Sequence, residues 1–208
     1  MLGVAENETR QAPDRARALA HYREAAAGYD ASCRRIAPKR LHALDLLELR
    51  GGESVIDVAC GTGAMLEPLS RAVGRNGCVV GIEQSPEMLA IARARVRSLG
   101  LQNVLLVESP VEEASVSLQA EAMLFCYTHD VLRSPAALQR LFSLAAPGAR
   151  VALCGAKLYP PWLGPLNAWV RWRVRRYLTT TEGLERPWSL LASYCPDFSI
   201  EATFFLGS

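Results

Sequence analysis

The chain has 208 residues, of which 50% are hydrophobic and 21% are charged, and its formal net charge is +2. These values are typical of one globular domain with a full core, and they exclude a charge excess that would demand nucleic acid or a membrane as partner. No apolar run reaches the roughly 18 residues of a membrane span, and the polar N-terminus lacks the apolar core of a signal peptide.

Six cysteines are scattered along the chain, and no two of them form a CxxC pair. They are Cys33, Cys60, Cys78, Cys126, Cys154 and Cys195. Several lie inside apolar runs, so we expect buried, reduced thiols and a cytoplasmic protein. The three histidines are not spaced with the cysteines as zinc ligands are, so we expect no metal site.

Two helices are predicted before a break at Arg50-Gly51-Gly52, over residues 13–27 and 31–49. The second carries an apolar stripe of leucines at positions 41, 44, 46, 47 and 49. From Ser54 onward, apolar strands alternate with helices. The predicted strands are Ser54–Val58, Gly77–Glu83, Asn103–Val107, Ala120–Cys126 and Arg150–Gly155. The predicted helices are Thr62–Val73, Ser85–Leu99 and Pro135–Ala145, with Ser85 as an N-cap and Pro147-Gly148 as a turn.

Such alternation, with strands apolar on both faces, predicts an α/β fold: a doubly wound, mostly parallel sheet with helices on both faces. Ligands of these sheets bind beyond the carboxyl ends of the strands, where the strand order reverses. The search for chemistry therefore begins where the first strand ends.

The stretch Asp57-Val58-Ala59-Cys60-Gly61-Thr62-Gly63 leaves that strand. Glycine permits a tight turn with positive φ and lets a ligand approach the main chain, and Glu83 follows at about the 20-residue distance of a ribose-binding carboxylate. The pair indicates an adenosine-type ligand; the alternative is a turn that needs glycine for packing alone. Leu66 stands where a dinucleotide fingerprint has its third glycine, which disfavours an oxidoreductase. A phosphate-free adenosine compound with a charged amino-acid tail fits better, since Asp57 can meet its ammonium group.

These residues carry a resemblance. VIDVACGTG and VVGIEQSPEMLAIARARV resemble the first two motifs of class I S-adenosylmethionine-dependent methyltransferases of the small-molecule type, such as ubiquinone/menaquinone C-methyltransferases and phospholipid N-methyltransferases. The match covers roughly residues 20–155 and includes the Pro147-Gly148 turn. It implies a Rossmann-like fold, S-adenosyl-L-methionine as cofactor and a small-molecule acceptor. We expect no nucleic-acid partner, because basic residues do not recur across the other faces. The implied cofactor-binding residues are Asp57, Cys60, Gly61, Thr62, Gly63, Glu83, Gln84, Met88, Pro110, Val111, Cys126 and Tyr127.

Two of these residues leave alternatives open. Met88 lies against the adenine in the family, but it also fits a core position on an amphipathic helix. Pro110 stands where the family has an acid for the adenine amino group. The Val111 backbone N–H, or a carboxylate from Glu108 or Glu112, is then the candidate replacement.

The acceptor site is expected after the fourth strand, in FCYTHD (residues 125–130). His129 is the candidate catalytic base, because an unperturbed pKa of about 6.5 lets it accept a proton near neutrality; positioning of substrate and a structural role are the alternatives. Tyr127 can position an acceptor or shield the sulfonium. Asp130 can orient His129 or cap the next helix.

Family resemblance also implies that residues 1–50 form a helical lid over a core of residues 51–208. Tyr22 and Tyr29 resemble tyrosines that close such a lid, although they also fit simple packing beneath it. We expect the lid to exclude water from the reaction.

A Trp/Arg-rich insert, at about residues 157–180, follows the fifth predicted strand. It contains three tryptophans, several arginines and no acid. It is interpreted as a substrate-binding cap, as a peripheral contact with an anionic membrane, or as an ordinary surface helix with arginine stems on the core.

Beyond the insert we predict a short helix over Pro187–Tyr194 and a last strand over Phe198–Phe205. The family has two strands at this end, so either one is missing or it lies unrecognised within residues 156–197. A missing strand would leave a sheet edge open to pairing, which predicts a homodimer or marginal stability.

The sequence thus favours a methyltransferase for a small, apolar acceptor. The alternatives are a phospholipid N-methyltransferase that docks on membrane and a non-catalytic cofactor-binding protein of the same fold.

Overall fold

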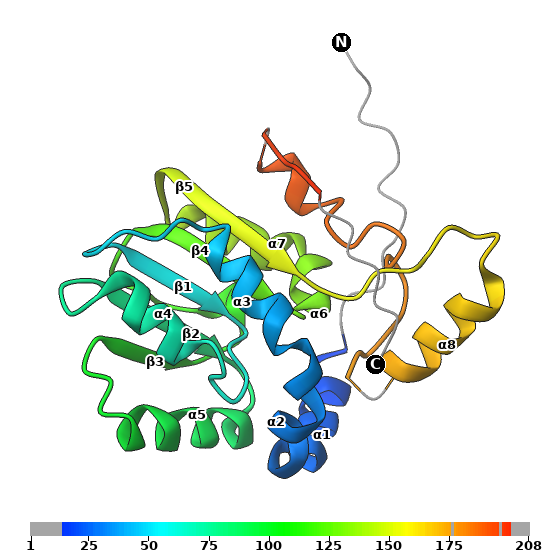
Figure 1. Cartoon of the computed structure of the whole chain (residues 1–208), viewed down its shortest axis with the longest axis horizontal. Helices are drawn as coiled ribbons and strands as arrows, with labels where there is room; N and C mark the ends of the chain where they lie inside the picture. The colour runs from blue at the N-terminus through cyan, green and yellow to red at the C-terminus, as the bar shows by residue number, and fades with distance from the viewer. Residues whose placement is uncertain (1–13, 176, 196, 201–208) are drawn as a thin grey trace.

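A parallel five-stranded sheet forms the centre of the molecule in the computed structural model, which describes residues 14–175, 177–195 and 197–200 (Figure 1). Its strand order is β3-β2-β1-β4-β5. The strands are β1 (Ser54–Val58), β2 (Cys78–Glu83), β3 (Val104–Glu108), β4 (Ala120–Cys126) and β5 (Ala145–Cys154). Because β1 pairs with both β2 and β4, the strand order reverses beside the end of β1, as the doubly wound prediction requires.

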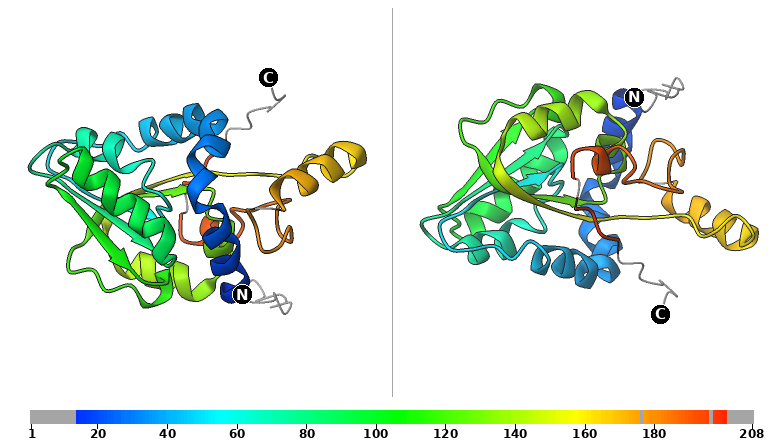
Figure 2. Two further views of the ribbon diagram at one scale, coloured as in Figure 1. Left: turned by 90° about the horizontal axis from the view of Figure 1, so that it is seen from below. Right: turned by 90° about the horizontal axis from the view of Figure 1, so that it is seen from above.

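Helices cover both faces of the sheet (Figure 2). One face buries an apolar cluster that includes Leu47, Leu69 and Leu89, from around α3 (Ala37–Asp45), α4 (Leu66–Val73) and α5 (Pro86–Ser98). The other face packs on α6 (His129–Leu132) and α7 (Pro135–Ser143), around Phe125, Leu138 and Leu141. Apolar strands buried on both faces therefore account for the parallel sheet.

The predicted start of α4 is wrong. The helix begins at Leu66, and residues 61–65 form turns. Gly61 and Gly63 have φ values of 58° and 76°, which a right-handed helix does not accept. The two glycines thus delay the helix by a full turn. The next helix agrees better, since the Ser85 hydroxyl accepts the Met88 N–H at the start of α5.

The predicted helix over residues 31–49 is also wrong in its continuity. The chain forms α1 (Arg15–Ala25), a 3₁₀ turn (Ala26–Gly28), α2 (Tyr29–Cys33), a second 3₁₀ turn (Arg34–Ile36) and then α3. Pro38 lies in the first turn of α3, where it has no N–H to continue a helix from the preceding residues. Leu41 and Leu46 of the expected apolar stripe are exposed, whereas Leu47 is buried.

The chain after β4 departs further from the predicted elements. β5 starts at Ala145, so the predicted Pro147-Gly148 turn lies inside it as an irregularity in the pairing with β4. α8 (Gly164–Val174) follows, and the predicted helix over Pro187–Tyr194 reduces to a 3₁₀ turn at Leu191–Ser193. Residues 198–200 form no strand, and residues 201–205 of the predicted last strand lie outside the described residues.

None of the described helices has both the length and the apolar character needed to cross a membrane.

Candidate active site

The loop after β1 holds several backbone conformations that favour glycine. Ala59 has a φ of 50°, and Gly61 and Gly63 continue the positive values. A Cβ added to Gly63 would lie 2.6 Å from Leu66 Cδ1, so this glycine is needed for packing. At Gly61 an added Cβ would meet no described atom within 4 Å. The positive φ therefore explains the glycine at 61. The absence of a side chain there leaves space beside the loop for a ligand.

Glu83 ties the end of β2 to this loop. Its Oε2 accepts the Gly61 backbone N–H at 3.0 Å and its Oε1 accepts the Ser85 backbone N–H at 2.7 Å. Burial raises the pKa of the Glu83 carboxyl, and the backbone N–H donors oppose that rise. The carboxylate predicted to bind a ribose thus lies directly beside the glycine loop.

Asp57 lies under the same loop, and the structure joins it to a residue that the sequence did not single out. Asp57 and Arg40 of α3 line a cavity of about 30 Å³, together with Cys60, Thr62 and Cys126. Both are buried, and Asp57 Oδ2 and Arg40 Nε have no hydrogen-bond partner among the described residues. Burial raises the pKa of Asp57 to about 7, against the pull of Arg40. A buried carboxylate and a buried guanidinium, each with a polar atom that lacks a hydrogen-bond partner among the described residues, indicate a site for a zwitterionic group.

The N-terminal helices close over this cavity. Tyr29 lines it, and Thr62 Oγ1 donates to Asp30 Oδ1 at 2.5 Å. Asp30 also pairs with Arg95 of α5. The tyrosine pair predicted for the lid is in edge-to-face contact, with the Tyr22 and Tyr29 ring centroids 6.4 Å apart.

The carboxyl end of β4 brings Tyr127, Thr128 and His129 to the same edge of the sheet. Tyr127 has a φ of 62°, a strained value for a non-glycine residue, and its ring lies 5.6 Å from the Arg40 guanidinium carbon. Thr128 Oγ1 and His129 Nδ1 are both buried, with no partner in the described part of the chain. Strain and unpaired polar atoms gathered at one edge are features of functional sites.

His129 is held by a segment far along the chain. Its Nε2 lies 2.9 Å from the Glu182 carbonyl oxygen. A carbonyl only accepts, so Nε2 carries the proton and Nδ1 presents a lone pair. Burial lowers the pKa of His129 below its usual 6.5, which keeps the ring neutral at pH 7. Asp130 accepts a hydrogen bond from Thr179 Oγ1 at 2.9 Å.

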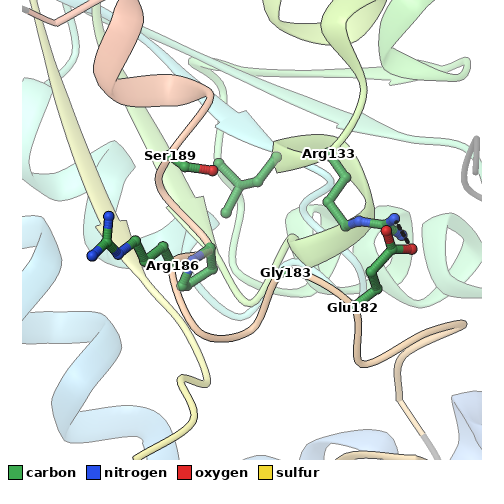
Figure 3. A pocket seen from close by; sticks show the side chains of 7 residues that line it. Arg133, Glu182, Gly183, Arg186 and Ser189 are labelled. Atoms are coloured by element: carbon green, nitrogen blue, oxygen red, sulfur yellow. Dashed lines mark hydrogen bonds and ion pairs between the residues drawn. The ribbon is translucent and has the colours of Figure 1, made fainter. Parts of the chain in front are cut away.

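A second cavity, of about 30 Å³, lies between the end of α6 and residues 182–189. Figure 3 shows Arg133 and Glu182 facing each other beside it, joined by an ion pair of 2.5 Å. The backbone that anchors His129 is therefore fixed by a side-chain contact as well.

The predicted adenine-side residues lie along the ends of β2 and β3. Met88 is fully buried, Gln84 and Pro110 are half-buried, and Val111 begins a 3₁₀ turn over Val111–Glu113. The Ser109 backbone N–H donates to the Glu83 carbonyl at 3.1 Å, which joins the two strand ends.

The two carboxylates considered as substitutes at Pro110 have other partners. Glu108 pairs with Arg93 at 3.0 Å, and Glu112 accepts from Ser134 at 2.7 Å. The Val111 backbone N–H is left as the simplest donor to an adenine ring nitrogen.

Sequence reasoning missed Arg40. Arg40 is buried on α3 beside Ala43, and Leu47 just beyond the helix is buried as well; an arginine in such a pattern is usually solvated. Its position three residues before Ala43 and seven before Leu47 was the available signal.

Comparison with known proteins agrees with this architecture. A family model described as "Methyltransferase domain" matches residues 49–163. The chain is 31% identical, over 153 residues, to 2-phytyl-1,4-naphtoquinone methyltransferase of Thermosynechococcus vestitus, a match that covers 73% of this chain and 65% of that protein. It is 30% identical, over 135 residues, to demethylmenaquinone methyltransferase of Oceanobacillus iheyensis, covering 62% of this chain and 55% of that protein. The matched part of the chain thus spans less than two thirds of the length of each of these two relatives.

A solved structure, the complex of DhpI with SAM and HEP, is similar with a TM-score of 0.59 and 25% identity. The similarity covers 77% of this chain and 73% of that one. Fold, glycine loop and family match agree, and the chain belongs to the methyltransferase domain family.

Proposed function

We propose that the protein is an S-adenosylmethionine-dependent methyltransferase that acts on a small, largely apolar acceptor. The observation that carries this proposal is the buried Asp57 carboxylate, whose Oδ2 lies unpaired in the described structure at the cavity beneath the glycine loop. A carboxylate there fits the ammonium group of an amino-acid tail, and Arg40 beside it fits the carboxylate. The similarity to a complex with SAM supports the same ligand.

The other residues have matching roles in the proposal. Glu83 accepts hydrogen bonds from the ribose, and Gly61 lets the ligand approach the main chain. Gly63, Gln84, Met88, Pro110 and Val111 border the adenosine, and Cys60, Thr62, Cys126 and Tyr127 border the tail. The bound cofactor supplies an electrophilic methyl group.

The acceptor side lies where the lid, the end of β4 and the segment after α8 meet. Tyr22 Oη donates to the Tyr177 carbonyl at 3.2 Å, and the Tyr29 and Tyr177 rings are 6.0 Å apart. Residues 177–182 thus touch both the lid and His129, which supports the cap interpretation for this part of the insert. We propose that residues 1–50 act as a lid on the core of residues 51–208, and that His129 Nδ1 accepts the proton of the acceptor.

The names of the two relatives favour a quinone-like acceptor. The test incubates purified protein with methyl-labelled S-adenosylmethionine and either demethylated naphthoquinones or phosphatidylethanolamine vesicles. Label in the quinone supports the proposal, and label in the lipid supports the phospholipid alternative. Cofactor binding by calorimetry without label transfer to either acceptor would favour the non-catalytic protein.

Two finer expectations complete the proposal. β5 is an edge strand of the described sheet, which supports pairing with a second copy. Light scattering after size-exclusion chromatography distinguishes this homodimer from a monomer.

All six cysteines are free thiols, which supports a reducing, cytoplasmic location. Fractionation of the source cells tests this location.

A further inference from the structure

α8 projects away from the sheet, as both views of Figure 2 show. It packs on a small apolar cluster of its own, in which Val170 contacts the region of Leu158 and Leu184. Asn167 fixes the helix, since its Oδ1 accepts the Tyr159 N–H at 2.8 Å and its Nδ2 donates to the Tyr159 carbonyl at 3.1 Å. The helix is therefore anchored on one side and presents its other side to solvent.

That other side carries large aromatic residues. Trp169 and Trp172 are 41% and 54% exposed, and being three residues apart they share one face of the helix, with Trp172 on the side opposite Val170. Trp162, in the turn before the helix, is 79% exposed. Three exposed indoles on one projecting element form an apolar surface, and such surfaces are typical of sites that bind a partner or a membrane.

Arginines lie over two of these indoles. The Arg173 guanidinium carbon lies 5.8 Å from the Trp169 ring, and that of Arg175 lies 5.7 Å from the Trp172 ring. Residues 158–178 contain no acid. Arg171 pairs with Glu185, at 3.4 Å, on the flank of the helix. The surface thus combines exposed indoles with positive charge.

We propose that the outer face of α8, with Trp162, docks on an anionic lipid bilayer. Indoles favour the membrane–water interface, and arginines beside them attract anionic headgroups. Charge complementarity favours lipid phosphate, and the three indoles favour a bilayer over a nucleic acid. Membrane docking goes beyond the proposed function. It rests on that function only for its biological use, because a membrane is where an apolar acceptor is most concentrated.

The test is sedimentation of the whole chain with vesicles of phosphatidylglycerol and phosphatidylcholine, or of phosphatidylcholine alone. We expect binding to the anionic vesicles that weakens with added salt. Trp169→Ala with Trp172→Ala should lower the partition coefficient at least about tenfold. Arg173→Gln with Arg175→Gln should lower it by about 30-fold at low salt.

Two matched variants serve as controls. Leu99→Ala with Leu105→Ala removes apolar side chains that are 44% and 57% exposed on the far side of the sheet, and Arg75→Gln with Arg97→Gln removes two exposed charges there. Both should bind vesicles like the wild type. Circular dichroism and calorimetric cofactor binding establish that each variant folds.

Absence of vesicle binding by the wild type would overturn the proposal, as would equal loss in the control variants. Binding to duplex or single-stranded RNA that competes fully with vesicles would point to nucleic acid and overturn it as well. Because vesicle binding is measured without cofactor or acceptor, its failure leaves the proposed enzyme activity untouched.

Discussion

The Gly61 backbone N–H donates to Glu83 Oε2 at 3.0 Å, a hydrogen bond that joins residues 22 apart in the chain. Through it, the carboxylate at the end of β2 and the turn at the end of β1 form one unit. The unit lies where the strand order reverses, the place at which doubly wound sheets bind ligands.

Replacement of Glu83 tests that unit. Glu83→Ala should weaken S-adenosylmethionine binding by about 1–3 kcal/mol, because charge-assisted hydrogen bonds to the ribose are lost. Calorimetric titration measures the affinity. Glu83→Gln is the matched control for shape, and thermal unfolding of both variants separates loop damage from lost ligand contacts. An unchanged affinity in Glu83→Ala would remove this residue from the site.

Asp57 should make stability depend on pH in an unusual direction. Burial raises its pKa from 3.8 to about 7 in the folded protein, whereas the unfolded chain keeps a value near 3.8. Between these values the folded state holds a proton that the unfolded state has lost, so the free energy of unfolding falls as pH rises from about 4 to about 7.

The comparison that isolates this effect is the wild type against Asp57→Asn. Denaturant unfolding at several pH values should give a fall in the wild type that the variant lacks, on the order of a few kcal/mol. Cofactor binding at pH 6 should also release a proton, since an ammonium group favours the carboxylate; calorimetry in buffers of different ionisation enthalpy detects it. Parallel pH curves for the two proteins would contradict the raised pKa.

The sheet could be predicted from the sequence because the strand signal is local. β1 and β4 have the predicted bounds, since buried apolar runs of strand length stand between glycine, proline and polar residues. Helix starts were less accurate where backbone conformation decided them. Positive φ at Gly61 and Gly63 delays α4, and Pro38 interrupts the helix predicted over residues 31–49.

The site was predictable only for residues that lie within the two sequence motifs. Asp57, Gly61 and Glu83 lie in two short stretches and were found together. Arg40 reaches the same cavity from a helix that precedes them, and Glu182 reaches His129 from 53 residues away in the chain. Contacts of this kind depend on how the insert and lid pack against the sheet, which no local pattern encodes.

The lid should limit how fast the cofactor enters. The cavity of about 30 Å³ is far smaller than the several hundred Å³ of a nucleoside-sized site, so we expect the proposed lid to open when the cofactor enters. Among the described residues, two ion pairs join it to α5: Arg23–Glu87 at 2.8 Å and Asp30–Arg95.

Arg23→Gln with Asp30→Asn should therefore raise the association rate of the cofactor by up to about 30-fold, because exposed ion pairs contribute up to about 1 kcal/mol each. Stopped-flow fluorescence measures the rate. Arg71→Gln, which breaks the Arg71–Glu67 pair within α4, should leave it unchanged. A rate that neither variant alters would mean that the lid does not gate entry.

His129→Gln distinguishes catalysis from structure. A glutamine side chain can still donate to the Glu182 carbonyl in place of Nε2, but it has no basic nitrogen in place of Nδ1. We expect folding stability and cofactor affinity to stay near those of the wild type while kcat falls by roughly 10²–10⁴, the usual contribution of a general base. Because burial lowers the pKa of His129, the acid limb of the wild-type kcat profile should lie below pH 6.5, and the variant should lack it. If kcat is unchanged and only stability falls, His129 serves to hold the segment of Glu182 against α6 and takes no proton.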